Sequence, residues 1–283
     1  MNSTWIVGLD GSDGSVSALR WAVDLAVQRG ERVTPIAAWH VPLPIWLMSG
    51  RRAVDVDRAG IRAGVAFHAE EAVRGLDDAT CVDEPQVLEG HPASILVELA
   101  GPESPLVVGR RGISDVKHRL LGSVSQYLVT HATGPVVVVP DDWTTSPLRR
   151  IVVGFDGSEY AAAGLRWALE IAPTDAEIEI VVGIDVIPWL GPEEVVERHP
   201  DAIAHARERI DAVADEVDPD RRATRSFVVQ GPRHALGEAM HDADLVVVGP
   251  RGVGGLARAL LGSVTGWLLH EAPCPIAVVP VAD

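Results

Sequence analysis

The sequence predicts an α/β protein made of two tandem, doubly wound parallel sheets of five strands each, with the Rossmann-like strand order 3-2-1-4-5. Three observations support this fold class. Short β-branched runs alternate with helical segments along the chain, the runs are apolar throughout as buried parallel strands require, and the succession of segments occurs twice. The length of 283 residues suits two domains of ordinary size.

Internal repetition places the domains. The run Ile6–Ser12 returns as Val152–Ser158, and Leu19–Ala22 returns as Leu165–Ala168 at the same spacing. Repeats of this length indicate a duplicated domain and not a solenoid of short units. The stretch 141–147, with its Thr, Ser and Pro, has the composition of a linker. We therefore expect domains at residues 1–143 and 149–283.

The first half contains five predicted strands. Residues 5–9 form a strand that ends in turn residues, and a helix follows that Ser15 caps and Gly30 ends. Its apolar residues recur at intervals of three and four. The remaining elements are a strand at 33–39, a polar helix at 56–75, a strand at 87–88, a short helix, a strand at 106–108, a helix at 124–131 and a strand at 136–139.

The second half repeats this pattern, with one polar helix predicted over residues 193–217. The last strand of each half, within 135–140 and 275–280, is an apolar edge bracketed by proline. An exposed apolar edge invites pairing with another strand. We therefore expect these two strands to pair and form an internal pseudo-dimer, and we expect that the whole chain can also form a homodimer.

A glycine-rich loop between a buried strand and a helix is the feature that points to function. Gly109–Gly112 is followed after nine residues by Gly122-Ser123, and Gly249–Gly252 is followed after nine residues by Gly262-Ser263. Glycine lets the backbone approach a ligand, and the N–H groups at a helix start attract anions. This pattern predicts phosphate binding, with a spacing that differs from the P-loop and from Gly-x-Gly-x-x-Gly.

An aspartate follows the first strand of each half. Sheets of this class bind ligands beyond the carboxyl ends of their strands, and the predicted order makes the first and fourth strands neighbours. Asp10 should therefore lie beside the first glycine loop and Asp156 beside the second.

These residues resemble the universal stress protein family. Its ATP-binding members carry Gly-x2-Gly-x9-Gly-Ser/Thr after the fourth strand and an Asp after the first, and both halves match over nearly the whole chain. The resemblance implies ATP as the ligand at two sites per chain, with Mg²⁺ held by the phosphates. It also implies little or no hydrolysis and a regulatory role in stress survival through unidentified protein partners.

The resemblance also implies roles for individual residues. Asp10 and Asp156 are expected at the ribose or adenine, and the backbone near Gly8, Ala38, Gly154 and Gly183 at the adenine. The expected set around the phosphates is Gly109, Arg111, Gly112, Gly122, Ser123, Val124 and Ser125 in the first half, and Gly249, Arg251, Gly252, Gly262, Ser263, Val264 and Thr265 in the second. Pro250 departs from the pattern because it removes one backbone donor from the second loop.

Structural interpretations stand beside the functional ones. Asp10 can simply cap its helix, Trp21 and Trp167 suit core packing, and the basic cluster Lys117–Arg119 suits a solvated surface. The sequence offers no evident general base and no metal-ligand spacing, so no catalytic or metal site is predicted. A slow ATPase or nucleotidyl-transfer enzyme, and a dimerisation scaffold that binds no nucleotide, remain the alternatives.

Composition restricts the partners. The net charge of −16 argues against nucleic acid and anionic membranes, which attract basic surfaces. No run of apolar residues is long enough to span a bilayer. The two cysteines, Cys81 and Cys274, are far apart in the sequence, which is typical of reduced compartments. We expect a soluble, cytoplasmic protein.

Overall fold

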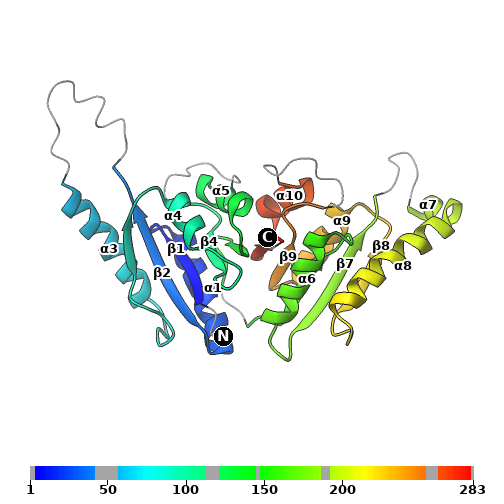
Figure 1. The fold of residues 1–283 in the computed structure, drawn as a ribbon, viewed down its shortest axis with the longest axis horizontal. Coiled ribbons are helices and arrows are strands. Elements are labelled where there is room, and N and C mark those ends of the chain that lie inside the picture. Colours follow the sequence, from blue (N-terminus) through cyan, green and yellow to red (C-terminus); the bar gives the residue numbers. More distant parts are fainter. Residues whose placement is uncertain are drawn as a thin grey trace, which may run out of the picture.

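One ten-stranded sheet runs through the whole molecule. The structure, a computed structural model, describes residues 4–41, 57–112, 121–144, 147–185, 192–252 and 261–281. The strands lie in the order β3-β2-β1-β4-β5-β10-β9-β6-β7-β8. Each half therefore has the predicted order 3-2-1-4-5. The halves lie side by side, the first on the left of Figure 1 and the second on the right.

The first half follows the predicted succession of strands and helices. Its elements are β1 (Thr4–Leu9), α1 (Asp13–Arg29), β2 (Arg32–Trp39), α3 (Arg58–Arg74), β3 (Gln86–Glu89), α4 (Pro92–Leu99), β4 (Leu106–Gly109), α5 (Ser123–His131) and β5 (Val136–Val139). All strand pairs within this half are parallel.

The second half repeats the succession with one additional break. Its elements are β6 (Arg150–Gly154), α6 (Glu159–Ile171), β7 (Glu177–Gly183), α7 (Pro192–Arg198), α8 (Pro200–Val217), β8 (Thr224–Val228), α9 (Pro232–Ala239), the 3-10 turn η1 (Met240–Asp242), β9 (Leu245–Val248), α10 (Ser263–Glu271) and β10 (Ile276–Val278). These strands also pair in parallel within the half.

The central strands β4, β5, β9 and β10 are buried on both faces, which explains why they are apolar throughout, whereas the outer strands β3 and β8 have no buried residue. Neighbouring residues of one strand point to opposite faces. Val7 and Val107 pack into a core with α1 and α6, whereas Ile6 and Val108 pack into a second core with α5 and α10. Two apolar cores on a single sheet are the expected consequence of a parallel α/β arrangement.

The start of α1 corrects one detail of the sequence analysis. Ser12, and not Ser15, is the N-cap residue, and its hydroxyl accepts a hydrogen bond from the Ser15 amide at 3.2 Å. Asp10 positions this cap, because its Oδ1 accepts from the Ser12 amide at 3.0 Å and from the Ser12 hydroxyl at 2.6 Å. Gly30 ends the helix with a φ of 66°, as predicted.

The polar helix predicted over residues 193–217 is in fact two helices. α7 ends at Arg198 and α8 begins at Pro200. Proline has no amide hydrogen and its ring clashes with the preceding turn, so it is accepted at the first turn of a helix and disrupts the interior. The corresponding α3 has no proline and is one helix.

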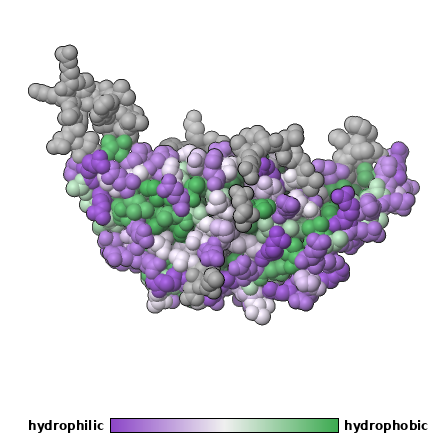
Figure 2. Space-filling view, in the orientation of Figure 1, coloured by the Kyte–Doolittle hydropathy of each residue, from purple (hydrophilic) through white to green (hydrophobic). Residues whose placement is uncertain are grey.

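The outer helices mark the two ends of the molecule. α3 buries only Ala69 and α8 buries only Ala214 among their described side chains. In Figure 2 hydrophilic side chains cover both outer ends, and apolar surface lies nearer the middle of each half. In the described part of the chain, none of the helices is long and apolar enough to cross a bilayer.

An antiparallel seam joins the two halves, as the proline-bracketed edges predicted. β5 pairs with β10, with Val138 opposite Ile276 and Val137 opposite Ala277. These four residues are no more than 1% exposed. The two apolar edges therefore cover each other, and the chain forms an internal pseudo-dimer.

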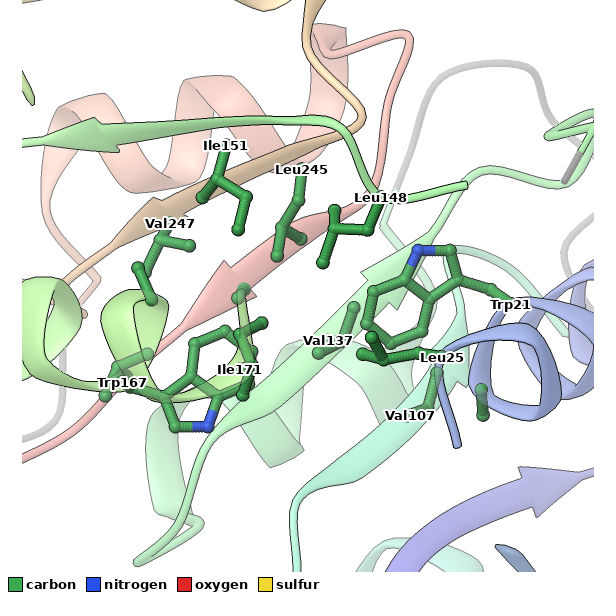
Figure 3. Close-up of a cluster of buried hydrophobic side chains, with 14 of the residues drawn as sticks. Trp21, Leu25, Val107, Val137, Leu148, Ile151, Trp167, Ile171, Leu245 and Val247 are labelled. Atoms are coloured by element: carbon green, nitrogen blue, oxygen red, sulfur yellow. The ribbon is translucent and has the colours of Figure 1, made fainter. Parts of the chain in front are cut away.

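Tryptophans from both halves pack into one core together with Val137 of the seam. The Trp5 ring lies 5.8 Å from the Trp21 ring and 6.4 Å from the Trp167 ring, measured between centroids, with edge-on geometry in both cases. Figure 3 shows Trp21 and Trp167 pointing into one core, with Val137 between them and Leu148 of the connecting segment alongside. The interpretation of Trp21 and Trp167 as core residues is confirmed.

Each glycine loop is bonded to the helix that follows it. The buried Ser125 hydroxyl donates to the Gly109 carbonyl at 2.8 Å, and the buried Thr265 hydroxyl donates to the Gly249 carbonyl at 2.8 Å. These bonds hold α5 and α10 to the ends of β4 and β9. Ser125 and Thr265 therefore have a structural role, whatever contact they make with a ligand.

Replacing Trp167 by Ala should destabilise both halves, because the ring contacts Trp5 of the first half. Truncation of a buried tryptophan costs about 3–5 kcal/mol. Urea unfolding should show this loss, and hydrogen exchange should rise in β1 as well as in α6. Trp267→Ala, at a half-buried position of α10, is the control with a smaller effect. Faster exchange confined to the second half would contradict the coupling.

Replacing Ser125 by Ala should lower the free energy of unfolding by about 0.5–1.5 kcal/mol, the usual contribution of one hydrogen bond. Ser125→Thr is the matched control, since Thr265 already makes the equivalent bond in the second half. The threonine variant should keep most of the stability in urea titrations. Equal losses in the two variants would show that the hydroxyl bond is not the cause.

Candidate functional site

The carboxyl ends of β1 and β4 bring the predicted aspartate and glycine loop together. Asp10 follows β1, and its Oδ2 touches the place where a side chain on Gly112 would begin. The second half has the same contact between Asp156 Oδ2 and Gly252. A Cβ atom at either loop position would overlap that carboxylate, so a larger residue there would displace the aspartate side chain.

The first glycine of each loop has a packing role that the sequence analysis did not foresee. A Cβ on Gly109 would lie 2.6 Å from the Gly14 carbonyl carbon in the first turn of α1. A Cβ on Gly249 would lie 2.5 Å from the Cβ of Tyr160 in α6. Substitution of either glycine would therefore disturb the packing of a helix on its strand, with or without a ligand.

The helix that follows each loop begins without a side-chain cap. Gly122 is the N-cap of α5, and its amide donates to the Arg110 carbonyl at 2.9 Å, which closes the loop. Gly262 holds the same position before α10 and donates to the Pro250 carbonyl at 2.8 Å. The first turn of each helix thus presents backbone N–H groups and a positive dipole end, which favour an anion.

A cavity of about 340 Å³ opens at this point in the first half. It lies within the usual range of ligand pockets, roughly 300–1,000 Å³. Its walls combine the glycine loop and the start of α5 with apolar side chains of β2, β4 and α4. The lining residues are Gly8, Leu9, Asp10, Ser15, Ile36, Ala38, His40, His91, Pro92, Leu96, Val108, Gly109, Gly112, Gly122, Ser123, Val124 and Ser125.

All site residues predicted for the first half line this cavity except Arg111. Its guanidinium instead forms a hydrogen bond and an ion pair with Asp141, just beyond β5. In the second half the Arg251 guanidinium lies 5.3 Å from the centroid of the Tyr160 ring. The cluster Lys117–Arg119 lies outside the described residues.

The neighbouring Arg110 points away from the cavity and across the seam. Its guanidinium donates to the carbonyl of Ala272, the residue that ends α10 in the second half. Burial lowers the pKa of Arg110 below its ordinary value, although Asp141 opposes that shift. The first glycine loop is therefore bonded directly to the other half.

Two histidines in the lining were missed by the sequence analysis. His40 follows β2 and His91 follows β3, so both stand at carboxyl ends of adjacent strands. Their ring centroids lie 5.5 Å apart with the planes at 38°. The signal in the sequence was their position, one residue after a predicted strand or in the turn that follows one, and not any mutual spacing.

The second half keeps the loop geometry but differs beside the sheet. Gly154 packs against Val248 and Leu236, as Gly8 packs against Val108 and Leu96. Gly183, the counterpart of Ala38, lies directly under the turn that begins α9, so that a Cβ there would meet the backbone of Pro232. The two predicted sites therefore share the contact between an aspartate and the second glycine of the loop, and they differ at this end of the sheet.

A larger hollow, of about 630 Å³, lies between α1, the end of α3 and the connecting segment. Asp24, Asp77 and Asp78 line it together with Arg20. Three carboxylates against one guanidinium disfavour a phosphate-bearing ligand. The cavity at the glycine loop is the better candidate for an anion.

Comparisons with known proteins point to one family. The profile of the universal stress protein family matches residues 1–140 and again residues 147–280. A universal stress protein of Mycolicibacterium smegmatis (strain ATCC 700084 / mc(2)155) is 32% identical, with 97% of this chain and 96% of that protein covered. One from Mycobacterium tuberculosis (strain ATCC 25618 / H37Rv) is 31% identical, with 96% and 95% covered.

Solved structures extend the agreement to the fold. The crystal structure of a universal stress protein from Archaeoglobus fulgidus DSM 4304 is similar over 99% of both chains, with a TM-score of 0.66 and 20% identity. The two family matches cover nearly the whole chain, one in each half of the ten-stranded sheet. The chain belongs to the universal stress protein family, in its tandem form.

Proposed function

We propose that this protein is a nucleotide-binding regulator that holds ATP in the cavity of its first half and hydrolyses it slowly or not at all. The observation that carries the proposal is the composition of that cavity. It joins an apolar end, an aspartate and an uncapped helix start within one space of about 340 Å³. The repeated loop and the uncapped start of α10 predict a second place where phosphate groups can bind.

The apolar end suits a planar base. Ile36 and Ala38 of β2 and Leu96 of α4 line it, and the backbone of Gly8 lies beside Leu96. Apolar walls with a few oriented polar groups are typical of small-molecule pockets. The resemblance of both glycine loops to those of the family's ATP-binding members supports adenine as the base.

The other end suits ribose and phosphates. Asp10 has a carboxylate that can accept hydrogen bonds from sugar hydroxyls, and it stands between the base end and the loop. The first turn of α5 offers N–H groups to the phosphates, and a helix dipole contributes roughly 0.3–1 kcal/mol per charge there. Because Arg111 is paired with Asp141, we assign the phosphates to backbone groups and not to this arginine. Mg²⁺ would be held by the phosphates.

Slow turnover follows from where the titratable groups stand. Hydrolysis requires a group that positions or deprotonates water beside the terminal phosphate. The imidazoles in the described lining, His40 and His91, follow β2 and β3, whereas the phosphate end follows β4. The Asp10 carboxylate accepts hydrogen bonds from Ser12 and is assigned to the ribose. A binder that acts through protein partners in stress survival therefore fits better than an ATPase. Phosphate release measured under saturating ATP tests this alternative directly.

Replacing Ala38 by Phe should weaken ATP at least tenfold, because the larger side chain fills the base end of the cavity. Isothermal titration calorimetry of the wild-type protein should give a dissociation constant of about 1 μM or weaker. Ala202→Phe, on the exposed surface of α8, is the matched control and should bind as the wild type does. The circular dichroism spectra of both variants should be unchanged.

No heat of binding in the wild-type protein would contradict the proposal and favour a scaffold without nucleotide. Equal binding by the wild-type and Ala38→Phe proteins would place the ligand elsewhere in the molecule.

A further inference from the structure

His40 and His91 form one wall of the first cavity. Both side chains are exposed and line it, at the ends of two strands that pair with each other. Their rings lie 5.5 Å apart, on the side of the cavity that also carries Ala38 and Pro92. Flat imidazole rings stack on nucleobases, whatever the base.

We infer that these two histidines hold the nucleobase, and that base binding is therefore confined to the first half of the chain. The inference rests on the proposed nucleotide-binding function and names the residues that make one of the two repeated sites selective for it. At the equivalent described positions the second half has Asp185 and Gly231 in place of the two rings, and its backbone lies close to Gly183 at the base end.

Strand register identifies the equivalent positions. Ala38 pairs with Leu88, four residues before the proline that opens α4, and Gly183 pairs with Val228, four residues before the proline that opens α9. His40 therefore corresponds to Asp185. His91, the N-cap of α4, corresponds to Gly231, the N-cap of α9.

The backbone of the second half occupies the place of the base end. A Cβ on Gly183 would touch the Pro232 Cα, and it would lie 2.8 Å from the Pro232 nitrogen and 3.1 Å from the Gln230 carbonyl oxygen. In the first half the Ala38 methyl group lines an open cavity. The turn before α9 therefore packs directly against the end of β7. The equivalent end of β2 in the first half lines the cavity instead.

Charge acts in the same direction. The Asp185 Oδ1 lies 3.0 Å from the place where a Cβ on Gly231 would stand. A carboxylate is thus present where the first half has an imidazole, and it repels a ligand that carries several negative charges. The Asp156 contact with Gly252 and the uncapped start of α10 match the first half, so the features that face the phosphates are shared and the base end differs.

Calorimetric titration with ATP tests the inference. The wild-type protein should bind one ATP per chain, and the double variant His40→Ala/His91→Ala should bind it about tenfold more weakly or worse, because both stacking faces are lost. His40→Phe/His91→Phe keeps two aromatic faces and should retain most of the affinity. His68→Ala, at an exposed position of α3, is the matched control and should have no effect.

Inorganic tripolyphosphate separates the base from the phosphates. It lacks a base, so the alanine double variant should bind it as the wild-type protein does. Two ATP sites of equal affinity in the wild type would overturn the inference and leave the proposed function intact. An equal loss of tripolyphosphate and ATP would overturn it by assigning the histidines to the phosphates. No binding of ATP at all would overturn the proposed function itself.

Discussion

The antiparallel ladder between β5 and β10 is the contact on which the rest of the molecule depends. Four of its side chains, Val137, Val138, Ile276 and Ala277, are almost completely buried. Separately, each half would expose an apolar edge strand, which is prone to association. Pairing covers both edges and continues one sheet through the chain. It also brings Trp167 of one half against Trp5 of the other, so the halves share part of their core.

Close packing determines the geometry of the candidate site. Gly109 allows α1 to approach the end of β4, and Gly112 leaves room for the Asp10 carboxylate. Asp10 in turn positions Ser12, which caps α1. A single aspartate thus connects the first strand, the first helix and the glycine loop. The two interpretations of Asp10, as a member of the cap and as a member of the site, are compatible for this reason.

Most of the fold could be predicted from the sequence because its signals are local or repeated. Apolar β-branched runs specify the strands, and the proline-bracketed edges specify the seam. The duplicated order of elements indicates that Asp10 and the glycine loop are neighbours. The break between α7 and α8 also has a local signal, because Pro200 opens the second helix. The pairing of Arg111 with Asp141 has no such local signal, because it depends on where two loops meet in space. The wall formed by His40 and His91 could not be predicted for the same reason. Strand order makes the two histidines neighbours, while 50 residues separate them along the chain.

The Arg110 contact with Ala272 shows what fusion of two copies permits. In a symmetric homodimer each substitution at the interface appears twice, and the surface must remain complementary to itself. Here the position equivalent to Arg110 is Pro250, which has no side chain able to reach across the seam. Likewise Gly14 of one half corresponds to Tyr160 of the other. Because the two halves are covalently linked copies with separate sequences, a substitution in one half does not have to appear in the other. One half can therefore evolve for ligand binding while the other evolves for stability of the shared sheet.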